Sequence, residues 1–207
     1  AVATSDYKIP LLQVEDARLE LSQAAACFYP RQPKTIVAVT GTSGKTSVAD
    51  FVRQIFQLNG LMSASIGTLG VIRSDGQSYG SLTTPDPVTL HATLQTLADD
   101  GVQHVAMEAS SHGLDQKRLH GVRLTAAAFT NLGHDHLDYH STVSDYLAAK
   151  MRLFSELMPA DAPAIINADS RNAADVLQVV ESSGRRAILV GKSGSDIRTT
   201  EHFREGF

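Results

Sequence analysis

Short apolar runs alternate with amphipathic segments along most of this 207-residue chain. Runs rich in β-branched and small apolar residues predict buried strands near residues 35–40, 61–66, 102–107, 124–130, 163–167 and 187–191. Apolar residues that recur every three or four positions predict helices near residues 14–28, 45–59, 87–99, 142–157 and 170–183. A turn over residues 191–196 predicts a further short strand after it. Because strands alternate with helices, we expect an α/β fold with a doubly wound, mostly parallel sheet.

Turn and cap residues define several of these elements more closely. Asp86-Pro87 predicts the start of a helix, because aspartate caps the first turn and proline fits its first position. Asn59-Gly60 predicts the end of the preceding helix, where glycine is common. Residues 74–76, Ser-Asp-Gly, predict a turn between strands over 69–73 and 77–82, which would form a hairpin.

The composition is that of a globular chain, with 43% hydrophobic and 19% charged residues. A net charge of −4 gives no electrostatic reason to expect nucleic acid as a partner. No apolar stretch approaches the roughly 20 residues that cross a bilayer, and the chain does not open with a signal-peptide layout. We therefore expect a cytoplasmic protein without a membrane partner. We also expect a monomer, although composition does not bear on the oligomeric state. Its lone cysteine, Cys27, cannot form an internal disulfide, and we expect it to be a buried small apolar residue.

The strongest local pattern is Thr40–Ser47, which reads Thr-Gly-Thr-Ser-Gly-Lys-Thr-Ser directly after a predicted strand. Gly41 and Gly44 would let backbone N–H groups approach phosphate oxygens, while Lys45 offers a positive charge and Thr46 a hydroxyl for Mg²⁺. A valine stands where the full Walker pattern has its first glycine, so an ordinary strand-to-helix turn with an exposed lysine is the alternative. We expect this P-loop to bind the phosphates of ATP through Gly41, Thr42, Ser43, Gly44, Lys45, Thr46 and Ser47.

Two further polar clusters follow predicted strands, one over residues 107–113 and one over residues 130–138. The carboxyl ends of parallel strands meet at one edge of a sheet, so both clusters should lie near the P-loop. Glu108 ends an otherwise apolar strand, where a carboxylate is costly unless a cation or hydrogen bonds compensate it. We interpret Glu108 as a Mg²⁺ ligand shared with ATP, and the alternative is a carboxylate satisfied by a backbone amide.

Two other features stay ambiguous on the residues alone. The segment 134–140 holds three histidines and two aspartates, which could form a metal site or serve as structural side chains. Lys150 lies within a predicted helix, where an exposed lysine is the ordinary interpretation.

Together these segments resemble the Mur ligase family, the ATP-dependent amide ligases of peptidoglycan precursor synthesis. The resemblance covers most of residues 34–192 and looks most like the central domain of the ligases that add the third residue of the stem peptide. The matching stretches are Thr40–Ser47, Leu82–Pro87, Met107–Arg118, Thr130–His140, Ala148–Lys150 and Ile165–Asp169.

The resemblance implies that meso-diaminopimelate or L-lysine is joined to UDP-N-acetylmuramoyl-L-Ala-D-Glu through an acyl phosphate. It implies two Mg²⁺ ions, one shared by Thr46 and Glu108 and a second bound by His136. It further implies that Lys150 reacts with CO₂ and serves as a carbamate, a catalytic group beside Lys45 and His136. It implies that Asn167 lies near the adenine. It also implies contacts with the UDP-muramyl dipeptide from Thr83, Thr84, Ser110, Gln116 and Arg118.

The resemblance also sets expectations about domains. Residues 1–33 resemble the tail of an N-terminal domain with its linker, and residues 34–207 resemble an ATP-binding central domain that is incomplete at its C-terminal end. The C-terminal domain that binds the amino acid is not represented, so we expect this piece alone not to ligate. The alternatives are another ligase of the superfamily, similar to folylpolyglutamate synthases, or a non-catalytic nucleotide-binding module.

Overall fold

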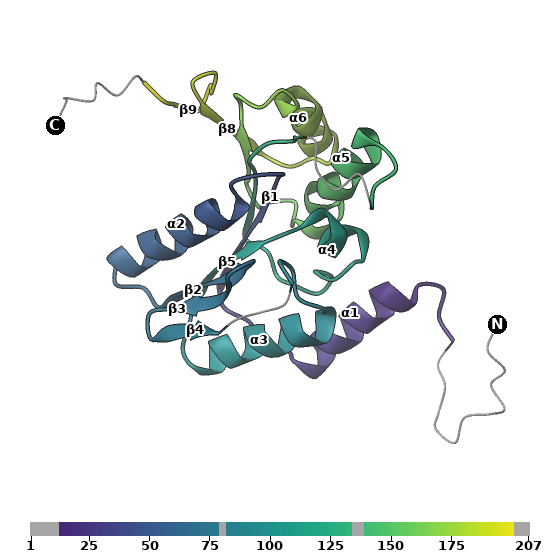
Figure 1. Ribbon diagram of the computed structural model, residues 1–207, viewed down its shortest axis with the longest axis vertical. Helices are drawn as coiled ribbons and strands as arrows, with labels where there is room; N and C mark the ends of the chain where they lie inside the picture. Colours follow the sequence, from purple (N-terminus) through teal and green to yellow (C-terminus); the bar gives the residue numbers. More distant parts are fainter. Residues whose placement is uncertain (1–12, 79–81, 134–138, 201–207) are drawn as a thin grey trace.

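The computed structural model describes residues 13–78, 82–133 and 139–200, and within them the chain forms one nine-stranded sheet flanked by helices (Figure 1). The strands are β1 (Thr35–Thr40), β2 (Ser63–Gly67), β3 (Gly70–Arg73), β4 (Gly76–Ser78), β5 (His104–Glu108), β6 (Ala126–Phe129), β7 (Ala164–Asn167), β8 (Ala187–Gly191) and β9 (Ile197–Arg198). The helices are α1 (Ala17–Phe28), α2 (Lys45–Leu58), α3 (Pro87–Asp99), α4 (Ser111–Asp115), α5 (Val143–Arg152), the π-helix η2 (Leu153–Leu157) and α6 (Ala173–Ser182).

The strands lie in the order β4-β3-β2-β5-β1-β6-β7-β8-β9. Among the described strands only β3 pairs antiparallel, with β4 in the predicted hairpin and with β2 on its other side, and the other pairs are parallel. The expected mostly parallel α/β sheet is therefore confirmed. Because β1 lies between β5 and β6, their carboxyl ends adjoin: Glu108 is in register with Val39, and Phe129 with Thr40. The polar segments that follow these three strands begin next to one another.

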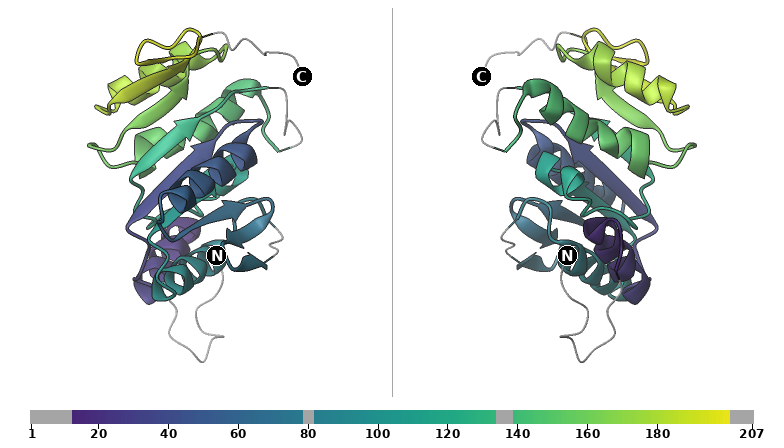
Figure 2. Two further views of the ribbon diagram at one scale, coloured as in Figure 1. Left: turned by 90° about the vertical axis from the view of Figure 1, so that its left-hand side faces the viewer. Right: turned by 90° about the vertical axis from the view of Figure 1, so that its right-hand side faces the viewer.

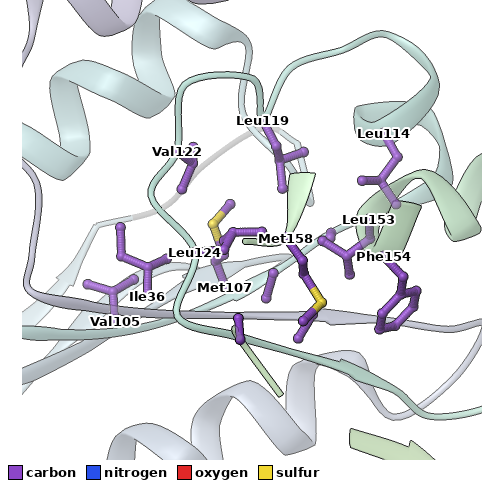
Figure 3. Packing of buried hydrophobic residues seen from close by; sticks show 14 of the residues in the cluster. Ile36, Val105, Met107, Leu114, Leu119, Val122, Leu124, Leu153, Phe154 and Met158 are labelled. Carbon is purple, nitrogen blue, oxygen red and sulfur yellow. The ribbon is translucent and has the colours of Figure 1, made fainter. Parts of the chain in front are cut away.

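The helices cover the two faces of the sheet unequally (Figures 1 and 2). Helix α2 lies alone on one face, and the other helices pack on the opposite face. That opposite face carries the larger core, in which side chains from β1, β5, α4, η2 and the loop before β6 interdigitate (Figure 3). The core on the α2 face is small and consists of Val39, Ala49 and Ala106, with partly buried neighbours.

Helix α2 begins and ends where the sequence predicts, after Gly44 and at Asn59. Its apolar residues are not all buried, since Phe51 and Ile55 are each 59% exposed and Leu58 is 87% exposed. The helical spacing of these residues therefore predicted the helix correctly but not which of its sides contacts the sheet.

Three details differ from the expectations. The predicted helix over 142–157 changes to a π-helix at Leu153, which places the consecutive Leu153 and Phe154 in the core. Helix α4 was not predicted, because five residues capped by the Ser110 hydroxyl give too short a pattern. Cys27 is exposed, so the prediction of a buried cysteine is wrong. Helix α1 buries Ser22 and Ala25, and Cys27 lies on a different side.

Among the described residues, no helix is long and apolar enough to cross a membrane.

Acidification should destabilise the fold through His91, whose side chain is fully buried on α3. Its Nε2–H donates to the carbonyl of His120 at 2.9 Å, and burial lowers its pKa below the ordinary 6.5. Below about pH 6.5 His91 therefore takes up a proton more readily in the unfolded chain than in the folded one. The free energy of unfolding decreases as the pH is lowered. His91→Gln keeps a donor for His120 and should weaken this pH dependence in urea titrations between about pH 7.5 and pH 5.5. An unchanged slope would contradict the assignment to His91.

Candidate active site

The loop between β1 and α2 requires its two glycines. Gly41 has φ +145°, and a Cβ there would lie 1.9 Å from Oγ1 of Thr130 and 3.1 Å from the backbone of Asn131. Gly44 has φ +83° and is the N-cap of α2. Both conformations are strained for any residue with a side chain, and at the first position the neighbouring strand leaves no space.

The residues that follow β6 hold this loop in place. The N–H of Thr42 donates to the carbonyl of Asn131 at 2.8 Å, and the N–H of Ser43 donates to the Asn131 side chain at 3.0 Å. The Thr130 hydroxyl donates to the Ser43 carbonyl at 2.7 Å. Two of the N–H groups that the sequence assigned to phosphate therefore bind Asn131 here. The N–H groups suited to an anion are instead those in the first turn of α2, because the N-cap Gly44 has no side chain to accept hydrogen bonds from them.

Two lysines meet at one carbonyl group of the loop. Nζ of Lys45 donates to the carbonyls of Gly41 and Thr42 at 2.9 and 2.8 Å, and Nζ of Lys150 donates to the same Gly41 carbonyl at 2.9 Å. Lys150 is only 1% exposed, so its interpretation as an ordinary exposed helical lysine is wrong. The structure thus brings a lysine of α5, more than a hundred residues away in sequence, to the P-loop.

Tyr146 was missed by the sequence analysis, although it lies one helical turn before Lys150. Its ring is fully buried, and Nζ of Lys150 lies 4.2 Å from the ring centroid. Its hydroxyl lies 3.1 Å from Oγ1 of Thr42, which also accepts the N–H of Gly133 at 2.8 Å. Tyr146 therefore ties α5 to the loop, and its spacing of four residues from Lys150 on a helix was the available signal.

Glu108 is only 2% exposed at the end of β5. Its Oε1 accepts the backbone N–H of Thr68 at 2.8 Å, which is the amide contact considered as an alternative above. A Cβ on Gly67 would lie 2.0 Å from Oε1, so a larger residue there would displace the Glu108 carboxylate. Glu108 and Thr46 are two of the residues around a hollow of about 10 Å³, whose lining is otherwise mostly apolar and includes Ala49, Ile66 and Ile72. Oε2 of Glu108 accepts the Thr68 hydroxyl at 3.3 Å, and the carboxylate is chemically the kind of oxygen ligand that Mg²⁺ prefers.

The predicted substrate-binding residues form a connected group around α4. The Thr84 hydroxyl donates to the Glu108 carbonyl at 2.9 Å and lies 3.0 Å from the Ser110 hydroxyl. The Arg118 guanidinium donates to the Thr84 carbonyl and to the Gln116 side chain, each at 2.6 Å. Thr83 joins through Oγ1 of Thr68, 3.1 Å away. Thr84 is fully buried, so its hydroxyl supports this group from within.

A largely apolar groove of about 340 Å³ lies beside the loop, between the start of α2 and strands β6 to β8. Asn167 lies at its edge and donates to the Thr130 carbonyl at 2.8 Å. A flat aromatic group fits such a groove better than a charged one, because Ala128, Ile165 and Val190 line it.

His136, together with the rest of residues 134–138, lies outside the described residues. Within the described part of the chain, no group of three or more histidine, cysteine, aspartate or glutamate side chains could hold a metal ion. The second Mg²⁺ site assigned to His136 therefore stays a prediction.

Comparisons with known proteins agree with this geometry. A family model for the Mur ligase middle domain matches residues 39–206. The chain is 57% identical over 198 residues to UDP-N-acetylmuramoyl-L-alanyl-D-glutamate–2,6-diaminopimelate ligase of Agrobacterium fabrum, covering 95% of this chain and 40% of that protein. It is 55% identical over 204 residues to the ligase of the same name from Brucella melitensis, covering 98% of this chain and 42% of that protein.

Solved structures give the same result. A structure of UDP-N-acetylmuramoyl-L-alanyl-D-glutamate–2,6-diaminopimelate ligase matches with a TM-score of 0.74 and 29% identity, over 86% of this chain and 37% of the other. Escherichia coli FolC, solved with DHPP and ADP, matches with a TM-score of 0.65 but 15% identity, over 89% of this chain and 49% of the other, and shares the fold. The chain spans about 40% of the length of the curated relatives that it matches.

Proposed function

This chain belongs to the Mur ligase family, and we propose that it supplies the ATP-binding centre of a ligase that adds the third amino acid to UDP-N-acetylmuramoyl-L-Ala-D-Glu. The relatives named above act with 2,6-diaminopimelate, so meso-diaminopimelate is the favoured amino acid, with L-lysine as the other choice. The single observation that carries the proposal is the meeting of Lys45 and buried Lys150 at the Gly41 carbonyl. A nucleotide-binding module without catalysis has no need of the second lysine.

A carbamate on Lys150 is supported by its surroundings. Two ammonium groups that share one carbonyl oxygen repel each other, and Lys150 is almost completely buried. In its neutral form the Lys150 amine would attack CO₂, form an N–C bond and release one proton. The resulting anion removes the repulsion from Lys45 and offers two oxygens of the kind that Mg²⁺ prefers.

The metal ligands proposed from this chain are Glu108, Thr46 and the Lys150 carbamate, with His136 for a second ion. Glu108 and Thr46 support this by lining the same hollow. A Mg²⁺ ion bound there would offset charge on the triphosphate and polarise the phosphoryl group that is transferred. The start of α2 and the Lys45 ammonium would bind the phosphates, and the groove beside Asn167 would take the adenine.

The chemistry then needs little more than position and charge. The γ-phosphoryl group passes from ATP to the terminal carboxylate of the D-glutamyl residue, which gives an acyl phosphate and ADP. The incoming amine attacks the acyl carbon, loses a proton, and phosphate leaves. The proposed contacts of Thr83, Ser110, Gln116 and Arg118 orient the anionic dipeptide, because a guanidinium binds carboxylate or phosphate oxygens through two donors.

We also propose that residues 34–207 belong to the central, ATP-binding domain and residues 1–33 to the end of an N-terminal domain and its linker. The match of the family model from residue 39 supports this division. The ligase would act as a monomer in the cytoplasm, where ATP is available.

The test is an assay of phosphate release by the full-length enzyme. ATP, UDP-N-acetylmuramoyl-L-Ala-D-Glu and meso-diaminopimelate should together give tripeptide and phosphate, and omission of either acceptor should abolish release. L-Lysine in place of diaminopimelate shows which amino acid is used. Release with a folate and glutamate, and none with the muramyl dipeptide, would replace the proposal by the folylpolyglutamate-synthase alternative.

A further inference from the structure

The segment between α4 and β6 contains a residue in an unusual backbone conformation. Lys117 has φ +58°, and it is the only non-glycine residue with a positive φ in the described part of the chain. A lysine in this region is strained unless its surroundings fix it. Its two neighbours are Gln116 and Arg118, which are both proposed to contact the substrate.

Helix α1 adds side-chain contacts to the local bonds that Lys117 makes with Leu114 and His120, although α1 precedes the part of the chain matched by the family model. Ser22 of α1 is fully buried, and its hydroxyl donates to the Lys117 carbonyl at 2.6 Å. Asp16, the N-cap of α1, pairs with the Lys117 ammonium. That hydrogen bond lowers the pKa of Asp16 to about 2. Both ends of Lys117, its carbonyl and its ammonium, are thus held by one helix.

The contact of α1 with this segment continues beyond Lys117. Gly121 has φ +87°, and a Cβ there would lie 2.4 Å from Cβ of Ala26. Just after α1, the Gln32 side chain donates to the Gly121 carbonyl at 2.9 Å and accepts the N–H of Arg123 at 3.0 Å. Lys117 and Gly121 therefore contact α1, and Gly121 and Arg123 contact the segment just after it.

The turn at Lys117 determines how its two neighbours lie. The guanidinium of Arg118 donates to the side chain of Gln116 and to the backbone carbonyl of Thr84. Among the described residues no carboxylate forms an ion pair with Arg118, so its partners there leave its charge uncompensated. A positive group held by neutral acceptors is suited to an anionic ligand.

We propose that α1 positions the substrate-binding pair Gln116 and Arg118 by holding Lys117 in its left-handed turn, with Ser22 and Asp16 as positioning residues. The inference rests on the proposed function for the identity of the anion, the UDP-muramyl dipeptide. It assigns to a helix outside the matched domain a part in substrate affinity. If the turn at Lys117 relaxes, the Arg118 guanidinium loses its bonds to the Thr84 carbonyl and to the Gln116 side chain.

The test uses two variants of the full-length enzyme. Ser22→Ala removes the bond to the Lys117 carbonyl, and Asp16→Asn removes the ion pair while keeping a good N-cap. Each should raise the KM for the UDP-muramyl dipeptide about tenfold and leave the KM for ATP within about twofold. Gln23→Ala, an exposed position on the same helix, is the matched control and should change neither KM.

A purely structural role would give a different result. It would lower the melting temperature of the two variants and leave the ratio of the two KM values unchanged, which would overturn the inference. In an Arg118→Ala background, Ser22→Ala should add little to the dipeptide KM, because Ser22 acts through Arg118. Full additivity would also overturn the inference. If the wild-type enzyme is inactive on the dipeptide, both the proposed function and this inference are refuted. If the wild-type enzyme is active but the two variants have its KM values, this inference alone is refuted.

Discussion

Replacement of Lys150 by alanine is expected to lower kcat of the full-length ligase about a thousandfold, the scale seen when a group that stabilises the transition state is removed. The reason is the position of Lys150, whose ammonium is buried and bonded to the Gly41 carbonyl of the P-loop. A carbamate there would carry the negative charge that the proposed Mg²⁺ site requires. Steady-state kinetics with saturating ATP and dipeptide measures the effect.

A short carboxylic acid should restore part of this activity. Alanine leaves a buried space beside the ring of Tyr146, and acetate or propionate can place two oxygens there. Lys150→Arg keeps the positive charge but cannot form a carbamate, so it should be inactive and should not respond to acids. Lys34→Ala, at an exposed position, is the matched surface control. Undiminished turnover in Lys150→Ala would remove this lysine from the catalytic centre.

Replacement of Gly41 by alanine should abolish measurable ATP binding, with a loss of affinity of about a hundredfold or more. The added Cβ would lie 1.9 Å from the Thr130 hydroxyl, so the loop or the end of β6 must move. Either movement breaks the bonds from Thr130 and Asn131 that hold the loop. Isothermal titration with a non-hydrolysable ATP analogue measures the affinity.

Gly76→Ala is a closely matched control for this substitution. Gly76 has φ +155°, close to the +145° of Gly41, but a Cβ there meets nothing within 4 Å. Both variants should therefore lose about 1–3 kcal/mol of stability from backbone strain, and only Gly41→Ala should lose the nucleotide. Equal ATP affinity in the two variants would show that the approach of Thr130 does not shape the site.

The sequence predicted the sheet and the family because these depend on local patterns. Each pattern is confined to a few consecutive residues, as in the apolar runs of β1 and β5 and the glycines of the P-loop. The family model confirms the assignment. The positions of the chemical groups around the site were partly predictable, since parallel strands bring Glu108 to the same edge of the sheet as the P-loop, and the pairing of β5 with β1 agrees with that expectation.

Other features depend on contacts between distant segments and could not be predicted. The residues around position 150 indicated only an ordinary exposed lysine, and the family resemblance alone implied a role beside Lys45; the burial itself results from packing of α5 against the P-loop. The same holds for Ser22, which lies in a row of small residues and contacts a carbonyl 95 positions away. Cys27 was expected to be buried because its neighbours in the sequence are apolar, but it lies on a side of α1 that is exposed in the described part of the chain.

The bonds from Lys45 to the carbonyls of Gly41 and Thr42 have a consequence for ligand entry. An ammonium has three N–H donors and these bonds use two of them, so a phosphate oxygen would share Lys45 with its own loop. The loop carbonyls and the polyanion would thus both draw on the charge of the same ammonium. Lys45, which is proposed to bind the triphosphate, would also stabilise the loop through the same two bonds.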